Sequence, residues 1–381
     1  MSAAPAAFTF GMEEEFFLID LRTRNAVPRV SKGFVAACRS RLGDAVTFEL
    51  QQTQVEVVSP VFTDPAEALR EMARLRSCVA EVANGMGLGI IAAGSHPLAR
   101  WHRHRHTEKP RYDRLIDTFQ MIGRRDVLCG LHIHVAVPDG DRVKVMNRLM
   151  PWLPLFLALS TSSPFWSLRR TGLLSYRQAV YDEWPRTGIP DFFDDQADYD
   201  AFIARLVRAG AIKDGSELWW AIRPSPRFPT LELRIADSCT RLQDAVALAT
   251  LFRCLVSAYV RQPHRDEQRS NATRRLIDEN RWRAQRYGLA TEFIIEGDDR
   301  TQNVTRRLDA ALDLVAADAR TLDPDGMLET LRSLLARGTS AHEQLARYER
   351  SREAGANHIE ALRCVVDWLA ETTAPGQQTV S

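Results

Sequence analysis

Hydrophobic and polar positions follow two different periodicities in the two parts of this 381-residue chain. Between about residues 8 and 240, short β-branched, aromatic and aliphatic runs predict strands at 8–21, 48–60, 89–94, 127–138 and 230–236. The segment after Asp64-Pro65 differs, because an Asp N-cap followed by Pro is a strong helix start and apolar residues then recur every three or four positions. We predict that this helix ends at Gly85 or Gly87.

After Asp237 the periodicity becomes helical. Helices are predicted at 244–260, 271–287, 301–317, 326–336 and 356–370, and Ser340-Ala341-His342-Glu343 has the pattern of a capping box that opens another. Because no linker separates the two parts, we expect one α+β domain over 1–371, with a sheet-rich core at about 8–240 and a helical part at about 241–371. Residues 372–381 are polar and are expected to form a flexible tail.

The most informative residues lie on four strand-like segments, where polar side chains alternate with apolar ones. Because successive side chains of a strand point to opposite faces, each polar pair shares a face while its apolar neighbours point the other way. The apolar faces can pack on the predicted helices, so the polar faces are expected to converge on the other side of one sheet. The pairs are Glu13 and Glu15, Gln54 and Glu56, His132 and His134, and Glu232 and Arg234.

So many carboxylates on one face indicate a cation site or a wet cleft, because burying them without partners would be very costly. Carboxylates with one or two imidazoles suit Mg²⁺ or Mn²⁺, whereas zinc would favour cysteine and more histidine. Each pair alone has an ordinary explanation, such as a solvated strand face or a cross-strand ion pair. Four such segments together favour the functional interpretation.

Composition and charge narrow the class of protein. The formal net charge of +1 does not indicate electrostatic attraction to nucleic acid or to a membrane surface. The six cysteines are widely spaced with no C-x-x-C pair, which is typical of reduced thiols in the cytosol. The segment before the first predicted strand, residues 1–7, is short and uncharged, so we expect no secretory signal. Prolines break the apolar stretch at 150–168, so we expect it to be buried core and not a membrane span. A cytoplasmic protein is predicted.

In order and spacing, these motifs resemble the glutamine synthetase superfamily. The matching segments are Gly11-x-Glu13-x-Glu15-Phe16-Phe17-Leu18-x-Asp20, the stretch from Glu49 to Glu56, Gly130-Leu131-His132-Ile133-His134, and Arg223-Pro224-Ser225-Pro226-Arg227 followed by Glu232, Arg234 and Asp237. Within it, the chain resembles the type 2 glutamate–cysteine ligases in Ser175-Tyr176-Arg177, Trp184-Pro185-Arg186, Trp220-x-x-Arg223-Pro224 and 244–248. The resemblance runs from about Phe10 to Leu251. It implies a curved, mostly antiparallel sheet with a polar concave face and helices packed on the other face.

The resemblance also implies roles for individual residues. One metal would be held by Glu15, Glu49 and Glu56, and a second, against the nucleotide phosphates, by Glu13, His132 and Glu232. Arg234 would touch the transferred phosphoryl group, which makes Glu232 and Arg234 the catalytic pair, and Arg223 and Arg227 would help to hold phosphates. Tyr176 and Arg177 would lie near the amino-acid substrate. Because Glu49 and Glu56 are seven residues apart, a bulge or turn around 51–53 is required for both to reach the metals.

The function implied is an ATP- and Mg²⁺- (or Mn²⁺-) dependent carboxylate–amine ligase with glutamate–cysteine ligase activity, which members of the group can carry only weakly. ATP would phosphorylate a carboxylate, and an amine would attack the resulting acyl phosphate; positioning and charge neutralisation dominate such phosphoryl transfer. Two other classes stay open, namely a non-nucleotide Mn, Fe or Mg metalloenzyme and a non-catalytic ATP or amino-acid sensor. The resemblance also implies a homo-oligomer, with a dimer favoured.

The run Trp101-His102-Arg103-His104-Arg105-His106, with Arg111 and Tyr112, has two explanations of equal weight. It is either a loop that helps to close over the substrate or a solvated basic loop. One short basic run does not indicate nucleic-acid binding. The expected partners are therefore ATP and small amino acids, with no nucleic acid and no membrane.

Overall fold

The computed structural model describes residues 8–137, 142–262, 270–298 and 300–377. Its largest sheet has seven strands in the order β2-β3-β1-β5-β9-β8, with β4 paired to β1, and all these pairings are antiparallel. Two small ribbons, β6-β7 and β10-β11, complete the strands of the described residues. The strands are β1 (Phe10–Asp20), β2 (Val46–Phe48), β3 (Gln54–Val58), β4 (Leu88–Ile91), β5 (Gly130–Ala136), β6 (Phe165–Trp166), β7 (Arg169–Arg170), β8 (Ile222–Pro224), β9 (Thr230–Asp237), β10 (Glu292–Ile294) and β11 (Thr301–Asn303).

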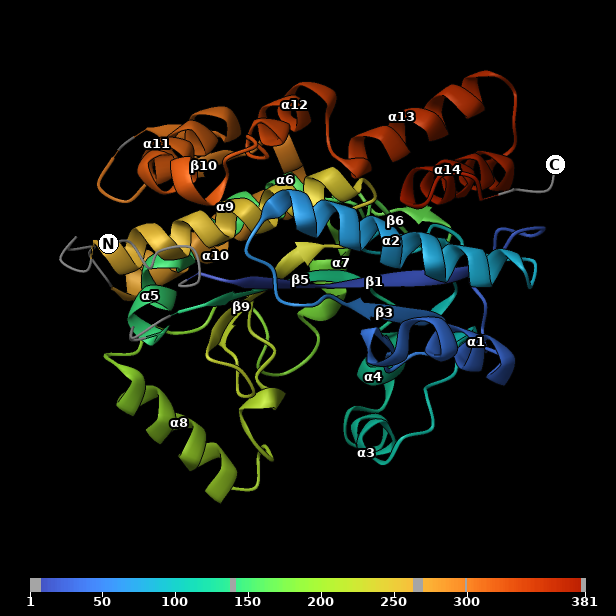
Figure 1. Cartoon of the computed structure of the whole chain (residues 1–381). Helices are drawn as coiled ribbons and strands as arrows, with labels where there is room; N and C mark the ends of the chain where they lie inside the picture. Colours follow the sequence, from blue (N-terminus) through green and yellow to red (C-terminus); the bar gives the residue numbers. More distant parts are fainter. Residues whose placement is uncertain (1–7, 138–141, 263–269, 299, 378–381) are drawn as a thin grey trace.

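Helices lie on both sides of the large sheet. Figure 1 shows α2, α6 and α9 on one side with α11, α12 and α13 further out, whereas α3, α4 and α8 project from the opposite side. The helices are α1 (Lys32–Leu42), α2 (Pro65–Asn84), α3 (Pro110–Phe119), α4 (Met121–Arg125), α5 (Arg142–Leu149), α6 (Leu153–Ser160), α7 (Tyr176–Tyr181), α8 (Gln196–Arg208), α9 (Leu242–Arg261), α10 (Asn271–Tyr287), α11 (Val304–Leu322), α12 (Glu329–Arg337), α13 (Ser340–Glu353) and α14 (His358–Thr373).

The apolar face of the sheet carries the packing. On β1, the alternate residues Met12, Phe16 and Leu18 are almost completely buried. They belong to one apolar cluster that includes residues of β5, β9, α2, α9 and α11. Because these helices cover the apolar face, the opposite face of β1, β5 and β9 is free to carry polar groups.

Glu14 is the exception on the apolar face of β1. It is completely buried, and Arg76 of α2 donates two hydrogen bonds to its carboxylate, at 2.9 Å to Oε2 and 2.6 Å to Oε1. Arg76 also donates to the backbone carbonyls of Thr240 and Cys239 at 2.9 and 2.7 Å. This buried ion pair therefore ties β1, α2 and the segment after β9 together.

Most predicted strands and helices are confirmed, and α10 has the predicted bounds. The predicted strand at 48–60 is wrong in part, because the chain turns between β2 and β3; Gln54 N donates to Gln51 O at 3.0 Å. The predicted helix at 301–317 starts later, since Asn303 caps α11 by accepting from Arg306 N. The capping box of α13 is formed by Thr339 and His342, so Ser340 is not the N-cap.

The flexible tail was expected at 372–381, but the chain is ordered beyond residue 372. Helix α14 continues to Thr373, and the buried side chain of Gln377 accepts a hydrogen bond from Ile90 N at 2.7 Å and donates one to Ile90 O at 3.1 Å. These bonds fix the chain to β4 at least to residue 377. Residues 378–381 lie outside the described residues, as do residues 1–7, so the absence of a secretory signal stays a prediction.

One helix of the described residues, α9, is long and apolar enough to cross a membrane by length and composition. However, 89% of its apolar window is buried inside the structure, which is the behaviour of a core helix. The apolar stretch at 150–168 contains α6, whose residues are all buried, as predicted.

Candidate active site

The polar faces of β1, β3, β5 and β9 line one cleft of about 590 Å³. Strand alternation brings them there, because their apolar neighbours pack on the helices. The cleft is lined by every residue of the sequence-predicted site except Tyr176, namely Glu13, Glu15, Glu49, Glu56, His132, Arg177, Arg223, Arg227, Glu232 and Arg234. The sheet therefore brings together residues that are up to 221 positions apart (234 − 13).

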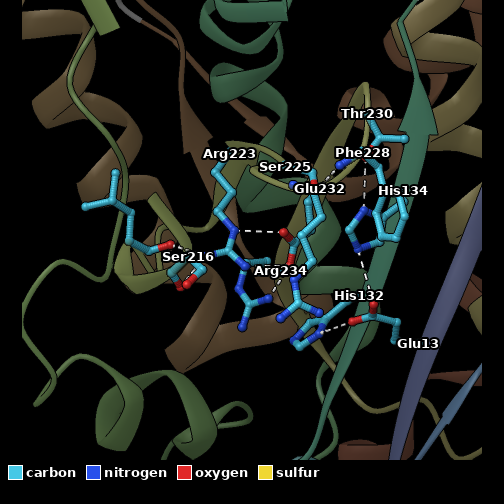
Figure 2. Close-up of polar contacts among 12 residues, drawn as sticks. Glu13, His132, His134, Ser216, Arg223, Ser225, Phe228, Thr230, Glu232 and Arg234 are labelled. Carbon is cyan, nitrogen blue, oxygen red and sulfur yellow. Dashed lines mark hydrogen bonds and ion pairs between the residues drawn. The ribbon is translucent and has the colours of Figure 1, made fainter. Parts of the chain in front are cut away.

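Glu13, His132 and Glu232 form the first acidic set, with one ligand atom from each lying within 4.8 Å of the other two. Glu13 and His132 are direct partners in the β1–β5 register, and His132 Nδ1 lies 3.2 Å from Glu13 Oε2. His134 Nε2 lies 3.4 Å from Glu13 Oε1 (Figure 2). Burial raises the pKa of Glu13, but the hydrogen bonds and charges of both histidines outweigh it, so the pKa lies well below its usual value.

The environment of His132 keeps its imidazole neutral. Burial, with the charge of Arg234, lowers the pKa of His132 to about 4. A neutral imidazole is the form that coordinates metals. The first set thus combines two carboxylates and one imidazole, which suits a hard divalent cation.

Two arginines hold Glu232 (Figure 2). Arg223 Nε donates to Oε2 at 2.7 Å and its Nη2 donates to Oε1 at 3.2 Å, while Arg234 Nη1 also donates to Oε1. Burial alone would raise the pKa of Glu232, but Arg234 and Arg223 hold it far below its usual range. Glu232 is therefore charged, and both guanidinium groups are positioned against it.

Glu15, Glu49 and Glu56 form the second acidic set, in which like charges meet. Glu15 and Glu56 are direct partners across β1 and β3, and the charge of Glu49 acts on both of them. Burial and the charge of Glu49 raise the pKa of Glu15 to about 8, and the same causes raise the pKa of Glu56 well above its usual value. One donated hydrogen bond, from Gly130 N to Glu15 Oε2 at 2.6 Å, offsets part of this repulsion.

The second set differs in one respect from the set implied by the resemblance. The ligand atoms of Glu15 and Glu56 lie within 4.8 Å of each other and of His132, whereas Glu49 is outside that group of described residues. His132 consequently stands between the two sets. A cation at Glu15 and Glu56 would relieve the repulsion that raises their pKa values, so these donors fit a hard divalent metal ion.

The turn that the sequence required between Glu49 and Glu56 is present. Residues 49–53 reverse the chain between β2 and β3, and Thr47 of β2 is the partner of Glu56. The segment before α3 braces this turn: the Thr107 hydroxyl donates to Glu49 O at 2.6 Å and Lys109 Nζ donates to Phe48 O at 3.0 Å.

The run at 101–112 fits the substrate-loop explanation in one part and the solvated-loop explanation in another. Lys109, Arg111 and Tyr112 line the cleft, as a substrate loop would. Arg103 and Arg105 are exposed, as in a solvated basic loop, and Trp101 and His102 line a separate surface hollow with Arg100 and 167–169.

Tyr176 and Arg177, predicted together as substrate residues, point in different directions. The Tyr176 ring packs on Trp166 with centroids 5.6 Å apart, and Tyr176 is not among the described residues that line the cleft. Adjacent residues on a helix are rotated by about 100° from each other, so α7 can present only one of them to the cleft. Arg177 and Tyr181, four residues apart on one face of α7, both line it.

Several residues that line the cleft were not predicted from the sequence. Asp126 follows α4 and precedes β5, and burial raises its pKa to about 7. Trp184 and Trp219 lie edge to face at 5.2 Å and form an aromatic wall. Tyr181 OH accepts a 3.4 Å hydrogen bond from Arg234 Nη2. Of these, only Trp184 lay in a motif already singled out, while Asp126 had no periodic signal at all.

Two solved structures share this fold. A bifunctional glutathione synthetase from Pasteurella multocida superposes with a TM-score of 0.68 over 96% of this chain and 52% of its own, at 13% identity. A glutamate–cysteine ligase from Francisella tularensis, in complex with AMP, superposes with a TM-score of 0.67 over 97% and 90%, also at 13% identity. At such identities the likeness shows the fold alone, and it confirms the predicted glutamine synthetase-like α+β class.

Sequence relatives over 97% of the chain define the class of protein as a ligase that forms carbon–nitrogen bonds. A protein from Ectopseudomonas mendocina (strain ymp), provisionally named glutamate–cysteine ligase 2, is 46% identical over 373 residues, 97% of this chain and 98% of its own length. A protein with the same provisional name from Rhodospirillum rubrum is 44% identical over 375 residues, 97% and 96% of the two chains. The profile of glutamate–cysteine ligase family 2 matches residues 9–363, and the chain belongs to that family.

Proposed function

We propose that this ATP-dependent carboxylate–amine ligase activates a carboxylate as an acyl phosphate and joins it to an amine, with glutamate and cysteine as the first pair to test. The observation that carries the proposal is the convergence, in one cleft, of two acidic sets and of arginines from β8, β9 and α7. Phosphoryl transfer needs positioning and charge neutralisation more than covalent chemistry from the protein. This arrangement supplies both.

Mg²⁺ is the proposed cofactor, and the donors fit it. Glu13, His132 and Glu232 would hold one ion, and Glu15, Glu49 and Glu56 would hold another, with His132 at the boundary. Bound Mg²⁺ would neutralise the phosphate oxygens of ATP and the second acidic set. The raised pKa values of Glu15 and Glu56 support this assignment, because they mark a concentration of buried negative charge that the charges of Arg177 and Arg234 offset only in part.

The arginines would bind the anionic groups of ATP and of the acid substrate. Glu232 holds Arg223 and Arg234 in place, so their remaining N–H groups are oriented before the nucleotide arrives. We propose that Arg234 contacts the transferred phosphoryl group and that Arg223 and the exposed Arg227 hold the other phosphates. Arg177 would bind a carboxylate of the amino-acid substrate, since two of its buried N–H groups have no partner among the described residues.

The experiment that tests this function is ADP release by the purified protein with Mg²⁺ and ATP, with glutamate against a panel of amines that includes cysteine. We expect ADP release that requires both a carboxylate and an amine, with an amide of the matching mass in mass spectrometry. Tight metal binding without ADP release for any pair would instead favour a non-nucleotide metalloenzyme or a sensor. The homo-oligomer, with a dimer favoured, and the cytoplasmic location stay proposals; light scattering tests the first.

A further inference from the structure

Among the described carboxylates that line the cleft, Asp126 is distinguished by its lack of a partner. Each of the others has a hydrogen-bond partner or a place in a proposed metal site: His132 contacts Glu13, Gly130 N donates to Glu15, Arg223 and Arg234 donate to Glu232, and Glu49 and Glu56 belong to the second acidic set. For Asp126, the described structure contains a backbone hydrogen bond, from its N to Gly123 O at 3.4 Å, but none to its carboxylate. Its side chain is half-buried and lines the cleft.

Arg177 has the complementary property on the cationic side. Only 2% of its surface is exposed, yet its Nε and Nη1 are buried without a hydrogen-bond partner in the described structure. Its Nη2 donates a long 3.4 Å bond to Arg234 O. Burying arginine N–H groups without hydrogen-bond partners costs free energy, so such groups in a cleft indicate that an anionic ligand binds there.

Asp126 and Arg177 line the same cleft, and the charge of Arg177 lowers the pKa of Asp126 against the effect of burial, but the two form no ion pair in the described structure. A ligand that separates two opposite charges can therefore lie between them and satisfy both. A zwitterionic α-amino acid has this distribution of charge, with one carboxylate and one ammonium group on the same carbon.

We propose that Asp126 binds the α-ammonium group of the amino-acid substrate whose carboxylate is held by Arg177. The assignment rests on the proposed function, and it makes Asp126 the residue that distinguishes an α-amino acid from the same acid without its amino group. The ammonium belongs either to the activated acid, where it does not react, or to the incoming amine, where it must pass a proton to Asp126 before the nitrogen attacks.

The test is a binding measurement that needs no turnover. Trp184 and Trp219 line the cleft, so tryptophan fluorescence, checked by calorimetry, can report Kd in the presence of Mg²⁺ and a non-hydrolysable ATP analogue. L-glutamate is compared with glutarate, and L-cysteine with 3-mercaptopropionate; each second compound lacks the amino group. The two pairs show whether Asp126 serves the acid or the amine substrate.

The wild-type protein should bind one of the amino acids more tightly than its amino-free analogue. Asp126→Asn should raise the Kd of that amino acid by about 10- to 100-fold, the usual range for the loss of a hydrogen bond to a charged group. The same substitution should change the Kd of the amino-free analogue by no more than about twofold. The matched control is Asp117→Asn, which removes an exposed carboxylate from neighbouring α3 outside the cleft and should leave both affinities unchanged.

Equal weakening of the amino acid and its analogue, or no weakening of either, would overturn the proposal, because Asp126 would then act on structure or on a later step. A wild-type protein that does not prefer either amino acid would also overturn it. The ligase function is judged separately by ADP release. If Asp126→Asn removes the preference while the wild type releases no ADP, the recognition role stands and the ligase function fails.

Discussion

The two acidic sets share one cleft but lie in opposite electrostatic surroundings. In the first set, histidines and arginines pair with Glu13 and Glu232 and hold the pKa of both well below its usual value. In the second set, burial and mutual repulsion raise the pKa of Glu15 to about 8 and that of Glu56 well above its usual value.

This difference gives the two proposed metal sites of one sheet opposite electrostatic character. The first set is held in position by the protein's own histidines and arginines, so its geometry is formed before any ligand arrives. The charges of Arg177 and Arg234 act on Glu15, but no arginine donates a hydrogen bond to the second set among the described residues, so this set gains most from a metal ion. The two sets should therefore respond differently to mutation, metal and pH, although both are proposed to serve the same reaction.

The largest effect is expected on activity, and it should be the same for both sets. Glu232→Gln, His132→Ala and Glu56→Gln should each reduce ATP turnover by about 10²- to 10³-fold or more, as loss of a preorganised group that stabilises charge does in other enzymes. Steady-state ADP release measures this. Glu71→Gln, on α2 and outside the cleft, is the control. Near-normal turnover in any of the three variants would contradict the site assignment.

Stability should separate the two sets. Glu232→Gln leaves two arginines against a neutral group and should lower the free energy of unfolding by about 3 kcal/mol, as breaking a buried pair does. Glu56→Gln removes repulsion and should leave the metal-free protein as stable as the wild type or slightly more stable. Urea unfolding with a chelator present measures both. Equal destabilisation by the two changes would show that the sets are electrostatically alike.

Magnesium should stabilise the wild-type protein mainly through the second set. At a Mg²⁺ concentration of about 100 times Kd, the expected gain is about 2.7 kcal/mol. Differential scanning fluorimetry with and without Mg²⁺ measures the rise in Tm. In Glu15→Gln the rise should be much smaller. An unchanged rise would place the stabilising ion elsewhere.

The smallest effect is a pH dependence of the metal-free protein. Glu15 has a pKa of about 8 when folded and 4.5 as its reference value, so the folded state holds its proton more tightly. Stability should therefore be highest below pH 4.5 for this group and fall as the pH rises toward 8, by at most about 1.4 kcal/mol per pH unit. Glu15→Gln should flatten this slope in urea unfolding at several pH values; a slope that does not change would contradict the raised pKa.

The period of the strands explains why much of this site could be predicted from the sequence. Alternation alone placed Glu13 with Glu15 and Glu232 with Arg234 on polar faces, because the apolar residues between them had to pack. The spacing of Glu49 and Glu56 likewise required the turn that separates β2 from β3. The grouping of Glu13 with Glu232 came only from the resemblance, since strand order is decided by long-range pairing.

Other residues could not be predicted, because tertiary packing decides where they point. Asp126 lies in a connection between α4 and β5, and nothing in its neighbours marks the direction of its side chain. Tyr176 lies beside Arg177 in the same motif, but helix geometry turns it toward Trp166. Gln377 looked like part of a flexible tail until its pairing with Ile90 was visible.

The most direct test of the central claim follows oxygen atoms through the reaction. The protein is incubated with ATP, Mg²⁺, the amine and a substrate whose carboxylate carries oxygen-18, and the released phosphate is analysed by mass spectrometry. An acyl phosphate intermediate predicts that one labelled oxygen moves from the carboxylate to each phosphate as the amide forms. Amide formation with unlabelled phosphate, or with AMP and pyrophosphate as products, would contradict the account.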